Sequence, residues 1–136
     1  MNERRVILIV EDDSAVAGMI EDHLTASGYV TDRAADGREA VERVRQSPPD
    51  LIVMDLMMPH LTGGEAAKEL RRDPLTSHIP IVAISAVADV TSIADFLPLD
   101  EVLPKPFDLI ELERAIQRHL PSLSDDPAET VTQPSV

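Results

Sequence analysis

The chain has 136 residues and carries 25 acidic against 12 basic side chains, a formal net charge of −13. This length predicts one folded domain, and the charge opposes binding to nucleic acid or to an anionic membrane surface. There is no cysteine, which excludes disulfides and thiolate metal sites and fits a reducing cytoplasm. The apolar run 6–10 is shorter than a signal-peptide core of about 7–15 residues or a membrane span of about 20, so we expect neither.

Strand-like runs alternate with stretches of helical spacing along the chain. The runs 6–10 and 51–54 are continuously apolar, as central parallel strands are, whereas the run 29–34 carries charge and suits an edge. The alternation predicts a doubly wound α/β fold, a parallel sheet covered by helices on both faces. In chain order the expected strands are 6–10, 29–34, 51–54, 79–84 and, with the weakest pattern, 101–103.

Capping signals mark where the helices begin and end. Asp36, Thr62 and Asp108 each precede a glutamate by three residues, the spacing of a capping box. Gly28 fits the C-terminal stop of the helix before it. The last helix has an apolar stripe at 109, 112, 116 and 120, and a less regular helix is expected at 89–97.

Residues 121–136 differ in composition from the rest of the chain. They contain proline, serine, threonine and acidic residues but no lysine or arginine. Such a segment cannot bury enough apolar surface to fold. We expect a folded domain over 1–120 and an acidic, disordered tail or linker over 121–136, and the composition leaves open whether a further domain follows.

Polar side chains stand at the ends of four of the expected strands. Glu11 and Asp12 follow the first strand, Asp55 the third, Ser85 the fourth and Lys105 the fifth. Taken singly, a strand-end aspartate is often a cap and a strand-end serine a turn residue. Ligand sites of open parallel sheets form at the carboxyl ends of the strands, so the five residues together predict one site.

These motifs resemble the receiver domain of two-component response regulators. The resemblance runs from about residue 5 to 120 and rests on the segments Leu8–Asp13 (LIVEDD), Val53–Pro59 (VMDLMMP), Ala83–Ala86 (AISA) and Pro104–Phe107 (PKPF). It implies a flavodoxin-like five-stranded sheet in the order 2-1-3-4-5 with five helices. It also implies that Asp55 accepts a phosphoryl group from a histidine kinase or phosphotransfer protein. The protein would then be a signalling switch rather than a turnover enzyme, acting on a downstream protein partner or a fused output domain.

The resemblance implies Mg²⁺ as the cofactor. Its ligands would be Asp12 and Asp55 directly, Glu11 directly or through water, and the backbone carbonyl of Met57. Such a set suits Mg²⁺, which prefers hard oxygen ligands and keeps several waters. Asp13 is one residue too late to join the set, and we expect it at the N-terminus of the following helix.

The remaining residues of the motif would handle the phosphoryl group. Phosphoryl transfer depends mainly on positioning and charge neutralisation, which a lysine at 105 and a hydroxyl at 85 supply. Ala86 is small enough to leave access. In the family the bond between the lysine and the following proline, here Pro106, is usually cis.

One position departs from the family and keeps two alternatives open. Receivers usually carry tyrosine or phenylalanine three residues before the lysine, but here that residue is Val102, which has no ring to reorient. A pseudo-receiver that serves only as a docking module is therefore an alternative. A phosphatase with an aspartyl nucleophile is another, but it commonly needs a second acid two residues later, where this chain has Met57.

Overall fold

The computed structural model describes residues 4–56, 63–86 and 98–120. Within these ranges the chain forms five strands and four helices. The expected helix 89–97, the tail 121–136 and Met57 lie outside the described residues. The strands are β1 (Val6–Val10), β2 (Val30–Ala34), β3 (Leu51–Asp55), β4 (Ile81–Ser85) and β5 (Glu101–Pro104), and the helices are α1 (Ser14–Ala26), α2 (Gly37–Gln46), α3 (Gly63–Arg72) and α5 (Leu109–His119).

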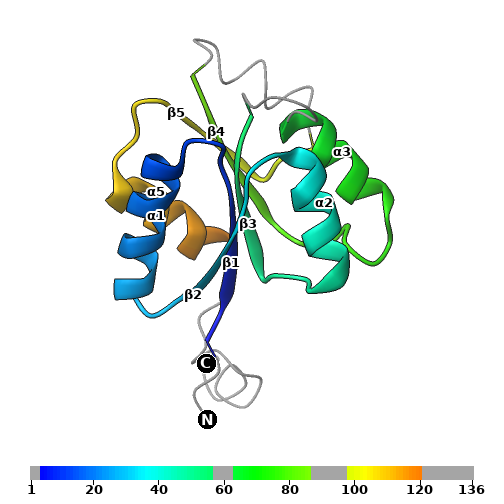
Figure 1. Ribbon diagram of the computed structural model, residues 1–136, viewed down its shortest axis with the longest axis horizontal. Coiled ribbons are helices and arrows are strands. Elements are labelled where there is room, and N and C mark those ends of the chain that lie inside the picture. The colour runs from blue at the N-terminus through cyan, green and yellow to red at the C-terminus, as the bar shows by residue number, and fades with distance from the viewer. Residues whose placement is uncertain (1–3, 57–62, 87–97, 121–136) are drawn as a thin grey trace, which may run out of the picture.

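The sheet is parallel throughout, in the order β2-β1-β3-β4-β5, which confirms the expected topology. Helices α1 and α5 cover one face, and α2 and α3 cover the other (Figure 1). The charged strand β2 lies at an edge, and the apolar strands β1 and β3 lie inside the sheet. Because both faces of these inner strands are covered, they are apolar at consecutive positions rather than at alternate ones.

Two aliphatic cores lie on either side of the sheet. Ile7 and Ile9 of β1 pack toward α1 and α5, while Leu8 and Val10 pack toward α2 and α3. Each of these side chains is at most 2% exposed. Burying a side chain of this size contributes about 1.5–3 kcal/mol, so mainly aliphatic packing stabilises both faces, with Tyr29 and Phe107 partly buried against the core on the α1 and α5 side.

The expected capping signals at Asp36 and Asp108 agree with the structure, with one difference, while Thr62 lies outside the described residues. Asp108 and Glu111 form the complete capping box at α5. At α2 the Asp36 side chain accepts from the Glu39 N–H at 2.8 Å, but Glu39 accepts from the N–H of Ala35 instead of Asp36. Asp13 caps α1, as its position outside the acid pair predicted.

Several strand boundaries differ by one or two residues from those expected from the sequence; β4 and β5, for instance, end one residue later, at Ser85 and Pro104. Residue 29 lies before β2, and β4 begins at Ile81 because the N–H of Ile79 is used in a turn to the carbonyl of Thr76. At the other end, β3 extends to include Asp55. The phosphoacceptor candidate therefore belongs to the strand itself, so the sheet ladder fixes its backbone.

Candidate metal and phosphoacceptor site

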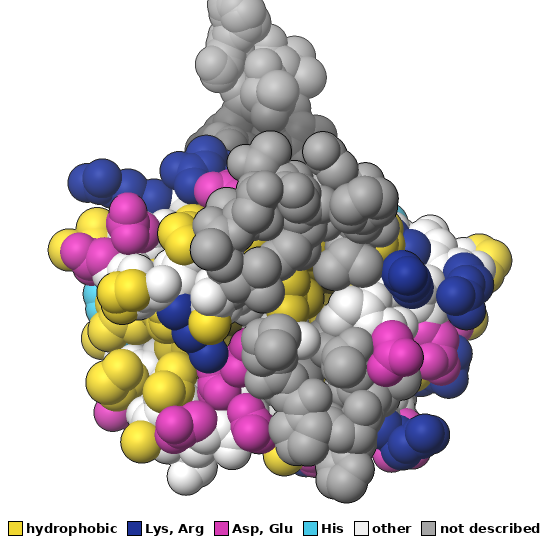
Figure 2. All heavy atoms as spheres, turned by 90° about the horizontal axis from the view of Figure 1, so that it is seen from above, with side chains coloured by type: hydrophobic (Ala, Val, Ile, Leu, Met, Phe, Trp, Pro, Cys, Tyr) yellow, Lys and Arg dark blue, Asp and Glu magenta, His cyan; other side chains and the backbone are white. Residues whose placement is uncertain are grey.

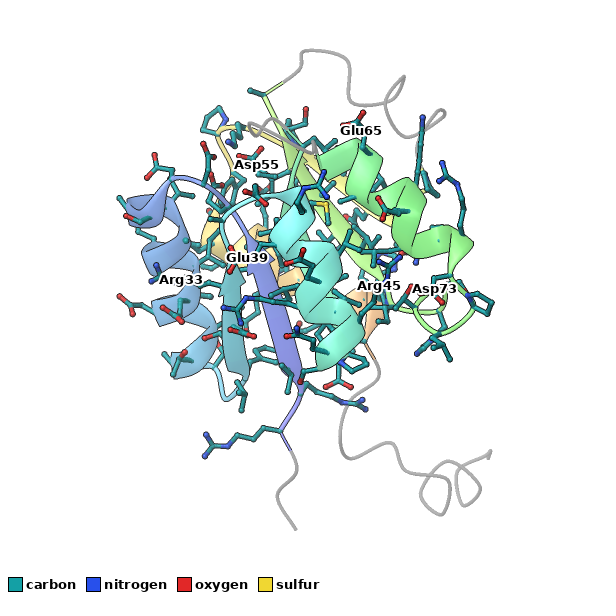
Figure 3. The ribbon with its side chains drawn as sticks, turned by 45° about the vertical axis from the view of Figure 1, so that its right-hand side comes forward. Arg33, Glu39, Arg45, Asp55, Glu65 and Asp73 are labelled. Carbon is teal, nitrogen blue, oxygen red and sulfur yellow. The ribbon has the colours of Figure 1, made fainter. Side chains whose placement is uncertain are left out.

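Asp55 stands at the carboxyl edge of the sheet, at the end of an inner strand. Its side chain is 2% exposed, and its backbone pairs with Ile84 of β4. Figure 3 shows Asp55 at the upper edge, where the strands end. An ionised carboxylate in such a place is costly unless positive charge or hydrogen bonds compensate it.

Two acids from the end of β1 lie beside Asp55. One carboxylate oxygen from each of Glu11, Asp12 and Asp55 lies within 4.8 Å of the other two. Glu11 is 6% exposed, and Asp12 lies at the surface. Figure 2, which looks down on this edge, shows acidic side chains gathered beside basic ones. The structure thus brings together the three acids that the sequence predicted to meet.

Glu11 is held in place but incompletely satisfied. Its N–H donates to the carbonyl of Ala34 at 3.0 Å, and its Oε2 accepts from the N–H of Asp13 at 3.2 Å. Its other carboxylate oxygen, Oε1, is buried and has no hydrogen-bond partner. An oxygen in this state is ready to receive a cation or a proton, because a buried acceptor without a partner costs about 1–3 kcal/mol.

The pKa of Glu11 is raised from 4.5 to about 7. Burial is the main cause, because it removes water from the charged form, and the neighbouring Asp55 adds repulsion and a hydrogen bond to the protonated form. The N–H of Asp13 and the charge of Lys105 act in the opposite direction. The protein therefore exchanges a proton at this site near neutral pH.

Lys105 approaches the same carboxylate from β5. Its Nζ lies 3.2 Å from Oδ2 of Asp55, and its backbone N–H donates to the carbonyl of Ser85 at 2.8 Å. Ser85 is fully buried, while Ala86 is exposed. The bond from Lys105 to Pro106 is cis, as expected. The acids and Lys105 thus come from the ends of three strands, and Ser85 lies at the end of β4, between β3 and β5 in the sheet.

The chemistry of the donor set fits a hard divalent cation. The three carboxylates face one ammonium group among the described residues, so the cluster has surplus negative charge. Mg²⁺ takes oxygen ligands and often only one or two carboxylates, the rest of its shell being water or phosphate. The unpartnered Oε1 of Glu11 is an oxygen that such an ion, or a water bound to it, would satisfy.

Val102 lies on β5 and is half-buried. Its place in the sequence pattern marks this position, whereas two charged residues at the amino edge of the sheet could not be recognised from the sequence. Arg71 at the end of α3 bonds to Asp100, just before β5. Neither residue belongs to a motif, and a contact 29 residues apart leaves no local pattern in a single sequence.

The fold and the site together define a class of protein. A parallel, doubly wound sheet whose carboxyl edge gathers acids, a hydroxyl and a lysine is suited to binding a cation together with a phosphoryl group. None of the helices in 4–56, 63–86 and 98–120 has the length and apolar character needed to cross a membrane.

Comparison with protein families identifies this class. Residues 7–117 match the model of the response regulator receiver domain, and the chain belongs to this family. The DNA-binding response regulator MtrA of Mycobacterium tuberculosis is 34% identical over 131 residues, which are 95% of this chain and 56% of that protein. The chain thus spans about half the length of the curated relatives that it matches.

Solved structures agree with this assignment. A response regulator from Chloroflexus aurantiacus has a TM-score of 0.82 and 34% identity, and the match covers 88% of this chain and all of that one. The receiver domain of a sensor histidine kinase from Pseudomonas aeruginosa has a TM-score of 0.80 and 32% identity, over 88% and 100% of the two chains. That structure holds a magnesium ion in its active-site cleft.

Proposed function

We propose that Asp55 accepts a phosphoryl group from a histidine kinase or a phosphotransfer protein, and that the domain passes this signal on through protein contacts. The observation that carries the proposal is the pairing of Asp55 with Lys105 at 3.2 Å beside two further carboxylates. Charge of both signs around one nearly buried carboxylate is what phosphoryl transfer to that carboxylate requires.

The reaction needs few protein groups. An oxygen of Asp55 attacks phosphorus, the new P–O bond forms and the P–N bond of the phosphohistidine donor breaks, so that the donor imidazole leaves with the electron pair. The ammonium of Lys105 stabilises the negative charge on the phosphoryl oxygens, and the hydroxyl of Ser85 donates to one of them. The product is an acyl phosphate on β3.

Glu11, Asp12 and Asp55 would hold Mg²⁺, with the backbone carbonyl of Met57 as a further ligand. The ion would neutralise the phosphoryl oxygens and the crowded carboxylates. The buried Glu11 sets the local charge, because its proton must leave before its carboxylate can bind the ion. We expect millimolar Mg²⁺ to raise the melting temperature near neutral pH, since a cation that binds only the folded state stabilises it.

We further propose that residues 1–120 act as the receiver unit and that 121–136 form a tail or linker. The partner would be a downstream protein or a fused output domain, which is in keeping with relatives about twice as long. The strong negative charge opposes contact of this domain with nucleic acid. With Val102 at the half-buried position on β5, the signal would leave the site without a reorienting ring.

Intact mass measurement after incubation with acetyl phosphate and Mg²⁺ tests the proposal. We expect one phosphoryl adduct on the parent protein and none on Asp55→Ala. Asp13→Asn is the matched control, because this neighbouring acid caps α1 and asparagine caps equally well. The control should form the adduct like the parent.

Two results would contradict the proposal. An adduct that persists in Asp55→Ala would place the acceptor elsewhere. The absence of an adduct with acetyl phosphate and with any histidine-kinase donor would favour the pseudo-receiver, and continuous phosphate release from unrelated esters would favour a phosphatase.

A further inference from the structure

We infer that Arg71 is a positioning residue for phosphoryl transfer, which acts through Lys105 by fixing the start of β5. The inference rests on the proposed function, because it concerns the rate of the same reaction. Arg71 lies at the end of α3, at the amino edge of the sheet, and its hydrogen-bond partners in the described chain include none of the acids of the site.

Arg71 connects three segments at the amino edge. Its guanidinium donates to the carbonyls of Ser77 at 3.0 Å and Ile79 at 2.6 Å, just before β4. It also donates to the carbonyl of Pro98 at 3.1 Å and to Oδ2 of Asp100 at 2.5 Å, just before β5. Its side chain is 20% exposed. A planar guanidinium with five N–H donors can hold several acceptors at once, which an ammonium cannot do with the same geometry.

Asp100 passes this restraint to the sheet. The same Oδ2 accepts from the N–H of Ile81 at 2.7 Å, and the N–H of Asp100 donates to the carbonyl of Ile81 at 2.9 Å. The pair of residues 81 and 100 therefore sets the first rung between β4 and β5. Because Arg71 bonds to Asp100, it also fixes the position of Asp100 beside Ile81.

Strand β5 needs such a restraint more than the other strands. It has four residues, pairs with β4 alone, and ends in Pro104, which has no N–H to donate. Just beyond the strand, the N–H of Lys105 donates to the carbonyl of Ser85. A short strand held on one side is free to shift unless both of its ends are fixed, and a register shift of one residue turns every side chain to the opposite face.

The position of Lys105 depends on this register. Its Nζ lies 3.2 Å from Asp55 only while β5 keeps its pairing with β4. The acids that would hold Mg²⁺ lie instead just after β1 and at the end of β3, and none of them is a hydrogen-bond partner of Arg71 in the described chain. Loss of Arg71 should therefore slow phosphorylation and leave the affinity for Mg²⁺ unchanged.

A double-mutant cycle of Arg71→Met and Lys105→Ala tests this inference. The measured quantity is the initial rate of adduct formation with acetyl phosphate at saturating Mg²⁺, well below the melting temperature of each variant. We expect Arg71→Met alone to lower the rate about tenfold, because a misplacement of about 1 Å in a reacting group costs up to about 10²-fold. In the Lys105→Ala background the same change should have no further effect, since the group that Arg71 positions is gone.

Further variants separate positioning from a general loss of stability. Arg71→Lys keeps the charge but cannot reach all four acceptors, so it should restore only part of the rate. Asp100→Asn removes the negative charge that pairs with Arg71 and should slow the reaction in the same way. It replaces Arg71→Met in the cycle if Arg71→Met does not fold. Arg45→Met is the matched control, because the ionic contacts of Arg45 are with Glu69 of α3 and with Asp73 just after it, and not with β5. Its rate should equal that of the parent.

Each outcome of the cycle has a clear meaning. Equal effects of Arg71→Met in the parent and in the Lys105→Ala background, or a weakened affinity for Mg²⁺, would overturn the inference and leave the proposed function intact. A parent protein that forms no adduct at all would overturn both.

Discussion

The two edges of the sheet deal with charge in opposite ways. At the amino edge, Arg71 is matched by four acceptors, and Asp100 bonds both to it and to the backbone of Ile81. At the carboxyl edge, three carboxylates crowd together and an oxygen of Glu11 is buried without a partner. At the amino edge the charged groups are paired and fix the starts of β4 and β5. At the carboxyl edge the negative charge of the carboxylates exceeds the positive charge beside it.

Within one domain, the charged side chains that serve the fold therefore differ from those that serve the site. A buried polar group that serves only the fold is expected to have its hydrogen bonds made, and exceptions require an explanation. The exception here lies where a phosphoryl group and a cation would supply the missing contacts. Substitutions at the two edges should therefore change stability in opposite directions.

Breaking the amino edge should give the largest loss of stability. Arg71→Met would leave three carbonyls and the Asp100 carboxylate without this donor, and we expect the free energy of unfolding to fall by about 3 kcal/mol. Urea unfolding followed by circular dichroism measures this change. A loss below about 0.5 kcal/mol, the level of an ordinary surface substitution, would show that the two edges do not differ as described.

The crowded carboxylates at the carboxyl edge should make the free energy of unfolding depend on pH. The folded protein keeps the Glu11 proton up to a pKa of about 7, while the unfolded chain loses it near 4.5. Between these values the folded state binds more protons, so without Mg²⁺ the free energy of unfolding should fall by roughly 2–3 kcal/mol as pH rises through this window. Unfolding curves from pH 4.5 to 8 test the slope, and Glu11→Gln should remove this contribution.

Neutralising Glu11 should stabilise the protein, unlike the loss of Arg71. At pH 8 in the presence of EDTA, Glu11→Gln removes a crowded negative charge and should raise the free energy of unfolding by roughly 2–3 kcal/mol, the loss that ionised Glu11 causes in the parent at this pH. The same variant should lose most of the rise in melting temperature that Mg²⁺ gives the parent. If Glu11→Gln were destabilising in EDTA, the carboxyl edge would not be under electrostatic strain.

The smallest effect is expected at the exposed ionic contacts of Arg45 with Glu69 and Asp73. Arg45 lies 3.7 Å from Glu69 and 3.5 Å from Asp73 and is 49% exposed (Figure 3). Exposed ion pairs contribute about 0.2–1 kcal/mol, so Arg45→Met should change the free energy of unfolding by less than about 1 kcal/mol. A loss as large as that for Arg71→Met would contradict the comparison, because it would show that the number and burial of an arginine's contacts do not decide its contribution to stability.

The fold was largely predictable from the sequence because its signals are local. Continuous apolar runs identified β1 and β3, the charged run identified β2 as an edge, and Asp108 with Glu111 identified the start of α5. Boundaries were less accurate where tertiary contacts decide them. Strand β4 begins at 81 because Ile79 is taken up by a turn, and no pattern in the run 79–84 reveals that turn.

The residues that meet at the site could be predicted from the sequence, but the protonation and hydrogen bonding of each one could not. Parallel strands bring their carboxyl ends to one edge, so the meeting of Glu11, Asp12, Asp55 and Lys105 followed from topology. That Glu11 rather than Asp55 carries the unpartnered oxygen depends on side-chain packing. The Arg71–Asp100 contact joins segments far apart in sequence and depends on how α3 ends beside β5.

The most direct test of the central claim is to locate the phosphoryl group in the chain. After incubation with acetyl phosphate and Mg²⁺, borohydride reduction converts an aspartyl phosphate to homoserine, which peptide mass spectrometry can place in the sequence. We predict homoserine at position 55 and at no other acid, with none formed when EDTA replaces Mg²⁺. Homoserine at Glu11's neighbour Asp12, or a phosphoryl group that resists reduction because it sits on a serine, threonine or histidine, would contradict the account.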